Sequence, residues 1–199
     1  MTEHLHEADP RVKRTRQLLL QAFTAVLAEK RSIHSITIRD ITQRATVNRA
    51  TFYAHFEDKD ALLDSWMREL FQQELARRLP ASPRLSVSVL RELILVVFNF
   101  LALVHSHRKR VNKQFDTLFE TALQQEVQKV LLSLLKQVSS CSPQDSKTLE
   151  ITALIVSWTI FGSAAQWSRE AGTCSAEEMT LHVLPFVIAG LSPILGPIV

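Results

Sequence analysis

The stretch ATVNRATFYAHFEDKDALL, residues 45–63, concentrates side chains that can hydrogen-bond to base edges and phosphates. Asn48 is suited to cap a short helix, because its side chain accepts a hydrogen bond from a free amide of the first turn. The polar residues of the helix predicted over 48–55 are Arg49, Thr51, Tyr53 and His55. A short helix with so little apolar surface is typical of one that enters the major groove of DNA. The stretch therefore predicts DNA binding rather than catalysis.

Positive charge gathers in front of this stretch, although the formal net charge of the chain is only +3. Residues 11–49 carry nine Lys and Arg against Glu29 and Asp40. The opening turns of the first helix hold Arg11, Lys13, Arg14 and Arg16, which can approach a DNA backbone. Such groups displace condensed counterions from phosphates. On charge alone, a solvated helix face is the alternative.

Elements that could position these residues are helical throughout. The chain has only four Gly, and strand-type alternation is scarce. Asp9-Pro10 opens a helix to about Glu29, and Thr37-x-x-Asp40 resembles a capping box for a second helix that ends near Ala45. Asp58 is placed to cap a long fourth helix. The fold class predicted is all-α.

Pro80 and Pro83 mark the one plausible boundary, followed by longer helices. These helices are predicted at about 85–106, 108–113, 115–138 and 145–171, and Gly172 caps the end of the fourth. A last helix begins at Ser175, is kinked at Pro185 and is followed by a turn-rich tail. The apolar run Leu93–Val104 has twelve residues, or about 18 Å of helix against a bilayer core of about 30 Å. A buried central helix is predicted, not a membrane span.

Enzyme signatures are missing from the sequence. There is no Gly-rich phosphate loop, nucleophile elbow or His-Glu-x-x-His segment. Cys141 and Cys174 lack a metal-binding spacing, and His105 and His107 would point to different faces of a helix. We expect no cofactor and no metal, and free thiols in a cytoplasmic protein. The polar, acidic start predicts no signal peptide.

Residues 11–75 resemble the DNA-binding domain of the TetR (tetracycline repressor-like) family of transcriptional regulators. The resemblance rests on spaced pieces that match in order: Thr37-Ile38-Arg39-Asp40-Ile41, Ala45–Val47, Thr51-Phe52-Tyr53-Ala54-His55-Phe56 and Lys59-Asp60-Ala61-Leu62-Leu63. It covers about one third of the chain strongly. The rest agrees only in length and helical character.

The resemblance assigns a role to each matching position. It implies phosphate contacts by Thr37, Tyr53 and Lys59, and contacts to base edges or nearby backbone by Arg39, Asn48, Arg49, Ala50 and Thr51. We expect Arg49 to read guanine, since its fork matches two major-groove acceptors, and His55 to donate to a phosphate. The alternative is local: Thr37 and Asn48 cap helices in any case, and Tyr53 could simply pack.

The chain departs from the family pattern at three places. Thr46 stands where Gly is usual in the turn, Thr42 where a small Ala is usual, and Ser32-Ile33 where Gly and an aromatic residue are usual. Thr is β-branched and disfavours positive φ, so we expect a strained or altered turn at Thr46.

For the C-terminal part, the resemblance implies a small-molecule pocket and a dimer. Ligand candidates are Phe98, Asn99, His105, Phe115, Phe119 and Trp158. In the family the last two long helices pair in a four-helix bundle, so the dimer candidates are Gly162, Ala165, Trp167 and Phe186. The alternative is that all of these residues form the core of one chain.

We therefore predict a tail (1–9), a helix-turn-helix DNA-binding domain with its linking helix (10–80) and a C-terminal ligand-binding and dimerisation domain (81–199). The predicted function is a homodimeric repressor that binds a palindromic operator in double-stranded DNA and is released by a small apolar ligand. The alternative is a protein-interaction module with a degenerate DNA-binding domain. No membrane partner is expected.

Overall fold

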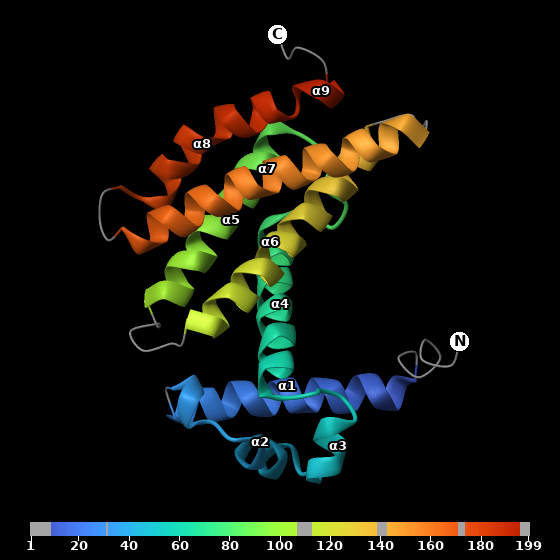
Figure 1. Ribbon diagram of the computed structural model, residues 1–199, viewed down its shortest axis with the longest axis vertical. Helices are drawn as coiled ribbons and strands as arrows, with labels where there is room; N and C mark the ends of the chain where they lie inside the picture. Colours follow the sequence, from blue (N-terminus) through green and yellow to red (C-terminus); the bar gives the residue numbers. More distant parts are fainter. Residues whose placement is uncertain (1–8, 31, 107–112, 139–142, 171–173, 196–199) are drawn as a thin grey trace. The chain divides into compact units, whose positions relative to one another are not determined.

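The structure, a computed structural model, describes residues 9–30, 32–106, 113–138, 143–170 and 174–195 (Figure 1). The elements, in order, are α1 (Pro10–Lys30), the 3-10 turn η1 (Ile33–Ser35), α2 (Ile38–Ala45), α3 (Arg49–Tyr53), α4 (Lys59–Arg78), α5 (Val87–Ser106), α6 (Lys113–Lys136), α7 (Pro143–Arg169), α8 (Ala176–Gly190) and α9 (Ser192–Leu195). No strand occurs in the described ranges, which confirms the all-α prediction.

Contacts divide the chain into two units, and α4 contributes to both. Residues 1–67 with 111–116 form the first unit, and residues 68–110 with 117–199 form the second. The division falls between Met67 and Arg68, whereas the sequence assigned the whole linking helix to the first domain.

The first unit packs α1 against α2 and the start of α4. Leu19 and Phe23 of α1, Ile41 of α2 and Leu62 and Leu63 of α4 are fully buried. Two contacts fix α4 to α1. The rings of Phe23 and Trp66 meet edge to face at 5.2 Å, and the Trp66 indole donates to Thr24 Oγ1 at 2.8 Å.

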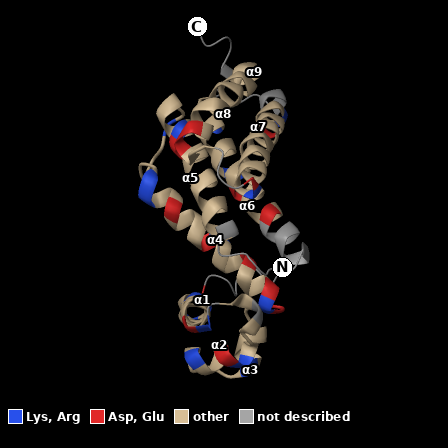
Figure 2. Ribbon diagram, turned by 90° about the vertical axis from the view of Figure 1, so that its left-hand side faces the viewer, with Lys and Arg blue, Asp and Glu red and all other residues tan. Residues whose placement is uncertain are grey.

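The second unit is built around α5, which packs against α7 and α8. Leu93, Ile94, Val97, Phe98 and Leu101 are all fully buried. Figure 2 shows that charged residues are sparse along this helix. The predicted buried central helix is thus confirmed.

Two helical segments among the described residues, Val87–Val104 and Ser146–Arg169, are long and apolar enough to cross a membrane. About half of each segment is buried inside the protein, 56% of the first and 50% of the second. Core helices of folded proteins have the same length and apolar composition, so the two segments are weak evidence for membrane insertion.

Most predicted helix starts are confirmed, because caps are local. Asp58 Oδ1 accepts from the Ala61 amide at 2.7 Å, and Ser175 forms a capping box with Glu178. One end was wrong: residues 192–195 form α9 where the sequence predicted a tail. Pro185 lies inside α8. The piece predicted at 108–113, the cap at Gly172, and Cys141 lie wholly or mostly outside the described residues.

Candidate nucleic-acid interface

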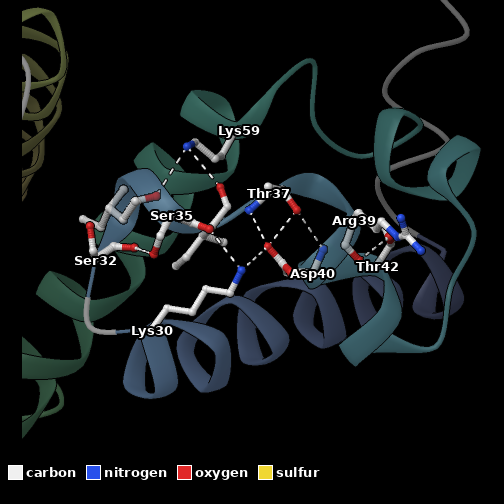
Figure 3. Close-up of polar contacts among 10 residues, drawn as sticks. Lys30, Ser32, Ser35, Thr37, Arg39, Asp40, Thr42 and Lys59 are labelled. Atoms are coloured by element: carbon white, nitrogen blue, oxygen red, sulfur yellow. Dashed lines mark hydrogen bonds and ion pairs between the residues drawn. The ribbon is translucent and has the colours of Figure 1, made fainter.

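Helix α2 begins at a closed network of hydrogen bonds around Asp40 (Figure 3). Thr37 Oγ1 accepts from the Asp40 amide at 3.2 Å, and the Thr37 amide donates to Asp40 Oδ2 at 2.7 Å. This is the predicted capping box, with Asp in the reciprocal position. Lys30 at the end of α1 adds a 2.7 Å ion pair to the same oxygen. The bonds from Lys30 and then Thr37 hold the pKa of Asp40 far below its usual range, so the network persists at neutral pH.

The turn from α2 to α3 requires a left-handed residue. Thr46 has φ 56° and ψ 41°, so the predicted strain at this position is present. The Val47 amide donates to Thr42 O and the Thr46 amide to Gln43 O, the two bonds of a Schellman motif. Thr42 is buried, and its hydroxyl donates to Arg39 O at 3.1 Å, which satisfies the polar group.

Helix α3 is shorter than the sequence predicted, Arg49–Tyr53 instead of 48–55. Asn48 caps it as expected, since Asn48 Oδ1 accepts from the Thr51 amide at 2.7 Å. After Tyr53 the hydrogen bonding is no longer regular, since the His55 amide donates to Phe52 O, three positions back, at 3.0 Å. An eight-residue helix was therefore wrong, although its start was right.

Two buried rings orient α3. Phe52 is fully buried and Phe56 nearly so, which turns the opposite side of the helix outward. The exposed residues on or beside that side are Asn48, Arg49, Ala50, Tyr53 and Ala54. The Arg49 guanidinium donates to the Tyr53 hydroxyl at 3.1 Å and lies 5.5 Å from the centre of its ring. This pair presents a planar fork of donors beside a phenol that is 46% exposed.

Lys59, at the start of α4, is half-buried and bound within the unit. Its ammonium donates to Ile36 O at 3.2 Å and to Ile33 O at 3.4 Å (Figure 3). Ile36 immediately precedes Thr37, so the cation lies beside the N-terminus of α2. A helix N-terminus and a neighbouring cation both favour a bound anion.

Arg16 has a role that the sequence did not reveal. It was expected to approach DNA with Arg11, Lys13 and Arg14. Instead its guanidinium lies 4.5 Å from the centre of the Phe56 ring and donates to His55 O at 3.3 Å and to Ser65 Oγ at 2.6 Å. Arg16 thereby ties α1 to the end of α3 and to α4.

His55 is half-buried next to this arginine. Burial, and then the charge of Arg16, lower the pKa of His55 below its ordinary value. The imidazole is therefore neutral at pH 7 in the free protein, and it can offer one ring N–H to a phosphate.

The structure thus brings most predicted DNA contacts to one unit in two sets. Asn48, Arg49, Ala50, Thr51 and Tyr53 lie on or at the start of α3; Thr37, Arg39 and Lys59 lie at the N-termini of α2 and α4. Basic residues mark α1, α2 and α3 in Figure 2. The polar groups of Asn48, Arg49 and Thr51 are of the kind that bind base edges, whereas Thr37, Tyr53 and Lys59 keep the predicted phosphate role and Arg39 its predicted role at base edges or nearby backbone.

The predicted ligand residues do not form one site in the described part of the chain. Phe98 is fully buried and contacts Trp167 at 5.2 Å between ring centres, Asn99 is half-buried and Trp158 is 52% exposed. The side chains of His105, Phe115 and Phe119 lie outside the described residues. The described residues also contain no group of three or more His, Cys, Asp or Glu able to hold a metal.

The predicted dimer residues divide into surface and core. Gly162 is exposed, with open space where a Cβ would lie, and Phe186 is 72% exposed. Ala165 is buried, and the Trp167 indole donates to Cys174 O at 3.1 Å. The last two side chains therefore serve the core of their own unit.

Comparison with known proteins places the first unit in a family. The profile for "Bacterial regulatory proteins, tetR family" matches residues 22–65, from the middle of α1 to α4. The regulator YxbF of Bacillus subtilis (strain 168), described as HTH-type, is 47% identical over 62 residues, or 31% of this chain. The N-terminal domain belongs to the TetR family. The match spans only 16% of the relative's length, so it concerns this domain alone.

Solved structures extend the likeness of fold over nearly the whole chain. A TetR-family regulator from Streptomyces coelicolor A3 superposes with a TM-score of 0.56 at 16% identity, covering 93% of this chain and 98% of that one. The regulator FadR from Bacillus subtilis, in complex with stearoyl-CoA, gives 0.50 at 17%, covering 87% and 98%. A TetR variant from Acinetobacter baumannii AYE, in complex with minocycline, gives 0.51 at 20%, covering 88% and 94%. At these identities the likeness concerns the fold alone.

Proposed function

We propose that this protein is a cytoplasmic transcriptional regulator that binds operator DNA through α3. The observation that carries the proposal is the polar outer side of α3, held by Asn48 and Phe52 within a TetR-family domain. Arg49 meets base edges, with its fork on guanine, while Thr37, Tyr53 and Lys59 hold phosphates. His55 donates to a further phosphate.

Binding of labelled duplex at several salt concentrations tests this proposal. Arg49→Ala is expected to relax preference at one base position, whereas Lys59→Ala weakens binding to all sequences and lowers the salt slope by about one unit. Selecting the preferred duplex from a random pool gives the operator first. An unchanged preference in Arg49→Ala rejects the base contact, and an unchanged slope in Lys59→Ala rejects the phosphate contact.

A second candidate is a protein-interaction module with a degenerate DNA-binding domain. The left-handed Thr46 favours it, because strain at this turn can misplace α3. The same titration separates the two: a regulator binds duplex with a steep salt dependence at low ionic strength, and the module does not bind.

We further propose that two copies pair through α7 and α8 to read a palindrome. An exposed apolar row on one face of α7 consists of Ile151, Leu154, Ile155 and Trp158, the positions i, i+3, i+4 and i+7 of a helix, and leads to Gly162. On α8, Leu181 and Phe186 are also exposed. An apolar surface of this kind typically marks an interface, and a dimer doubles the base pairs that are read.

Sedimentation or light scattering tests the dimer. Ile155→Glu places a charge at the centre of the row and is expected to give monomers. Val87→Glu, at a similarly exposed valine on α5, is the control, and its measured mass is expected to remain that of a dimer. A monomeric parent protein contradicts this part of the proposal.

The proposed response is release from the operator by a small molecule. Neighbours of the same fold hold stearoyl-CoA and minocycline, which supports a ligand site in the second unit. A ligand that binds the dimer better in its DNA-free geometry lowers affinity for the operator by the same factor that DNA lowers affinity for the ligand.

A further inference from the structure

A pocket with a cavity volume of about 320 Å³ lies in the second unit, beside the C-terminal part of α4 and the adjoining stretch of α6. Its wall is mostly apolar and includes Leu75, Leu79, Pro80, Val130 and Leu134. Small-molecule sites typically range from about 300 to 1,000 Å³ and combine such walls with a few polar groups. None of the predicted ligand residues lines it.

Lys129 supplies the charge at this pocket. Its ammonium pairs with Glu126 Oε1 at 2.8 Å, and its side chain is 67% exposed. An ammonium has three N–H donors, and the structure gives Lys129 one hydrogen-bond partner among the described residues. No carboxylate belongs to the described lining, so the charge at the pocket is positive.

Glu126 keeps Lys129 in place without neutralising it fully. The carboxylate is buried, 7% exposed, and also accepts from Arg68 at 2.8 Å and from Gln72 at 3.1 Å. One anion is therefore shared among several donors. Burial opposes its ionisation, but the bonds from Lys129, Gln72 and Arg68 outweigh burial and hold the pKa of Glu126 below its ordinary value. The anchor remains charged at neutral pH.

We propose that this pocket binds a small amphipathic carboxylate. Its hydrocarbon chain lies against Leu75, Leu79 and Leu134, and its carboxylate accepts from the free N–H donors of Lys129. A neutral apolar molecule would leave the charge of Lys129 unused, and an amine would be repelled by it. The pocket thereby gives the chemical class of the ligand for the proposed release from DNA. Only the effect of the ligand on DNA binding depends on the proposed function; binding of the carboxylate itself does not.

Calorimetric titration of the full chain with octanoate tests the site. Octanoate is expected to bind at one site per chain, more tightly than octanol, while octylamine binds weakest. Lys129→Gln is expected to weaken octanoate about tenfold and to leave octanol unchanged, since one charge-assisted hydrogen bond is lost. Lys136→Gln is the matched control, because Lys136 is an exposed lysine of the same helix outside the lining.

A blocking variant locates the ligand. Ser133 is an exposed lining residue, so Ser133→Phe is expected to fill the pocket and abolish octanoate binding with unchanged helix content. If that variant loses helix content, Ala76→Phe blocks the pocket from α4. The inference is overturned if octanoate does not bind, if octylamine binds as tightly, if Lys129→Gln matches Lys136→Gln, or if a folded blocked variant still binds. Loss of duplex binding with octanoate binding intact counts against the regulator alone.

Discussion

Helices α3 and α5 are stabilised in opposite ways. Helix α3 has five residues, contributes one fully buried side chain and keeps Arg49 and Tyr53 outside. Helix α5 has twenty residues and is buried on almost every side between α7 and α8. A helix that is apolar all round forms a core, whereas a polar one needs anchors and a partner. The contrast separates the segment that serves recognition from the segment that holds the second unit together.

Removing the ring of Phe52 is expected to have the largest effect on the first unit. Phe52 and Phe98 of α5 are both fully buried, so the two alanine variants are a matched pair. Each should cost about 3–5 kcal/mol of unfolding free energy. Phe52→Ala is expected to abolish duplex binding and to spare octanoate binding. Phe98→Ala is expected to spare the residues that contact the duplex and to impair octanoate binding. Thermal unfolding and both titrations measure this. Identical losses in the two variants would contradict the separation.

The sequence could predict what depends on near neighbours. The caps at Thr37, Asn48 and Ser175 join residues three positions apart, so a short window contains both partners. The strain at Thr46 was predicted from the resemblance, because Gly is usual at this position of the turn, and the observed φ of 56° agrees with it.

Contacts between distant residues could not be predicted in the same way. Arg16 finds Ser65 forty-nine positions away, and Arg68 finds Glu126 fifty-eight positions away. Nothing in the spacing of Arg11, Lys13, Arg14 and Arg16 distinguishes the one that binds inward. The length of α3 was missed for a related reason: Phe56 packs into the core, and the chain bends to bring it there.

Arg16 tests whether the end of α3 must be held for recognition. Arg16→Gln removes the contacts to His55 O and Ser65 Oγ, so duplex affinity should fall about tenfold. Arg14→Gln removes the same charge from an exposed position of α1 and controls for attraction to phosphates. A purely electrostatic role would give both variants equal loss. Loss of the charge next to His55 should also raise the pKa of His55 in Arg16→Gln alone, and NMR titration of the imidazole can verify that only this variant has changed the surroundings of His55.

Thr46 tests whether the turn before α3 is under strain. Thr46→Gly relieves the cost of a β-branched residue at φ 56° and raises the entropy of the unfolded chain. The balance should stabilise the protein by about 0.5–1 kcal/mol, seen as a higher midpoint of denaturation. Thr46→Ala keeps a Cβ in the left-handed region and should gain less. A lower midpoint for the glycine variant would mean that the Thr side chain supports the turn.

His55 should give the smallest effect, and its sign follows from its lowered pKa. The folded protein holds the imidazole neutral where the unfolded chain, near pH 6.5, begins to protonate it. Stability is therefore complete above pH 6.5 and declines as pH falls from there toward the folded pKa. In the complex with DNA the charged form of His55 is favoured instead, because a phosphate stabilises the charged ring. Duplex affinity should therefore rise as pH falls over the same range. His55→Gln should flatten both profiles, while His182→Gln, at an exposed histidine of α8, should leave them unchanged. Opposite slopes for stability and affinity, carried by one side chain, would show that His55, just after α3, both packs inside its unit and contacts DNA. Parallel slopes would assign His55 to the core alone.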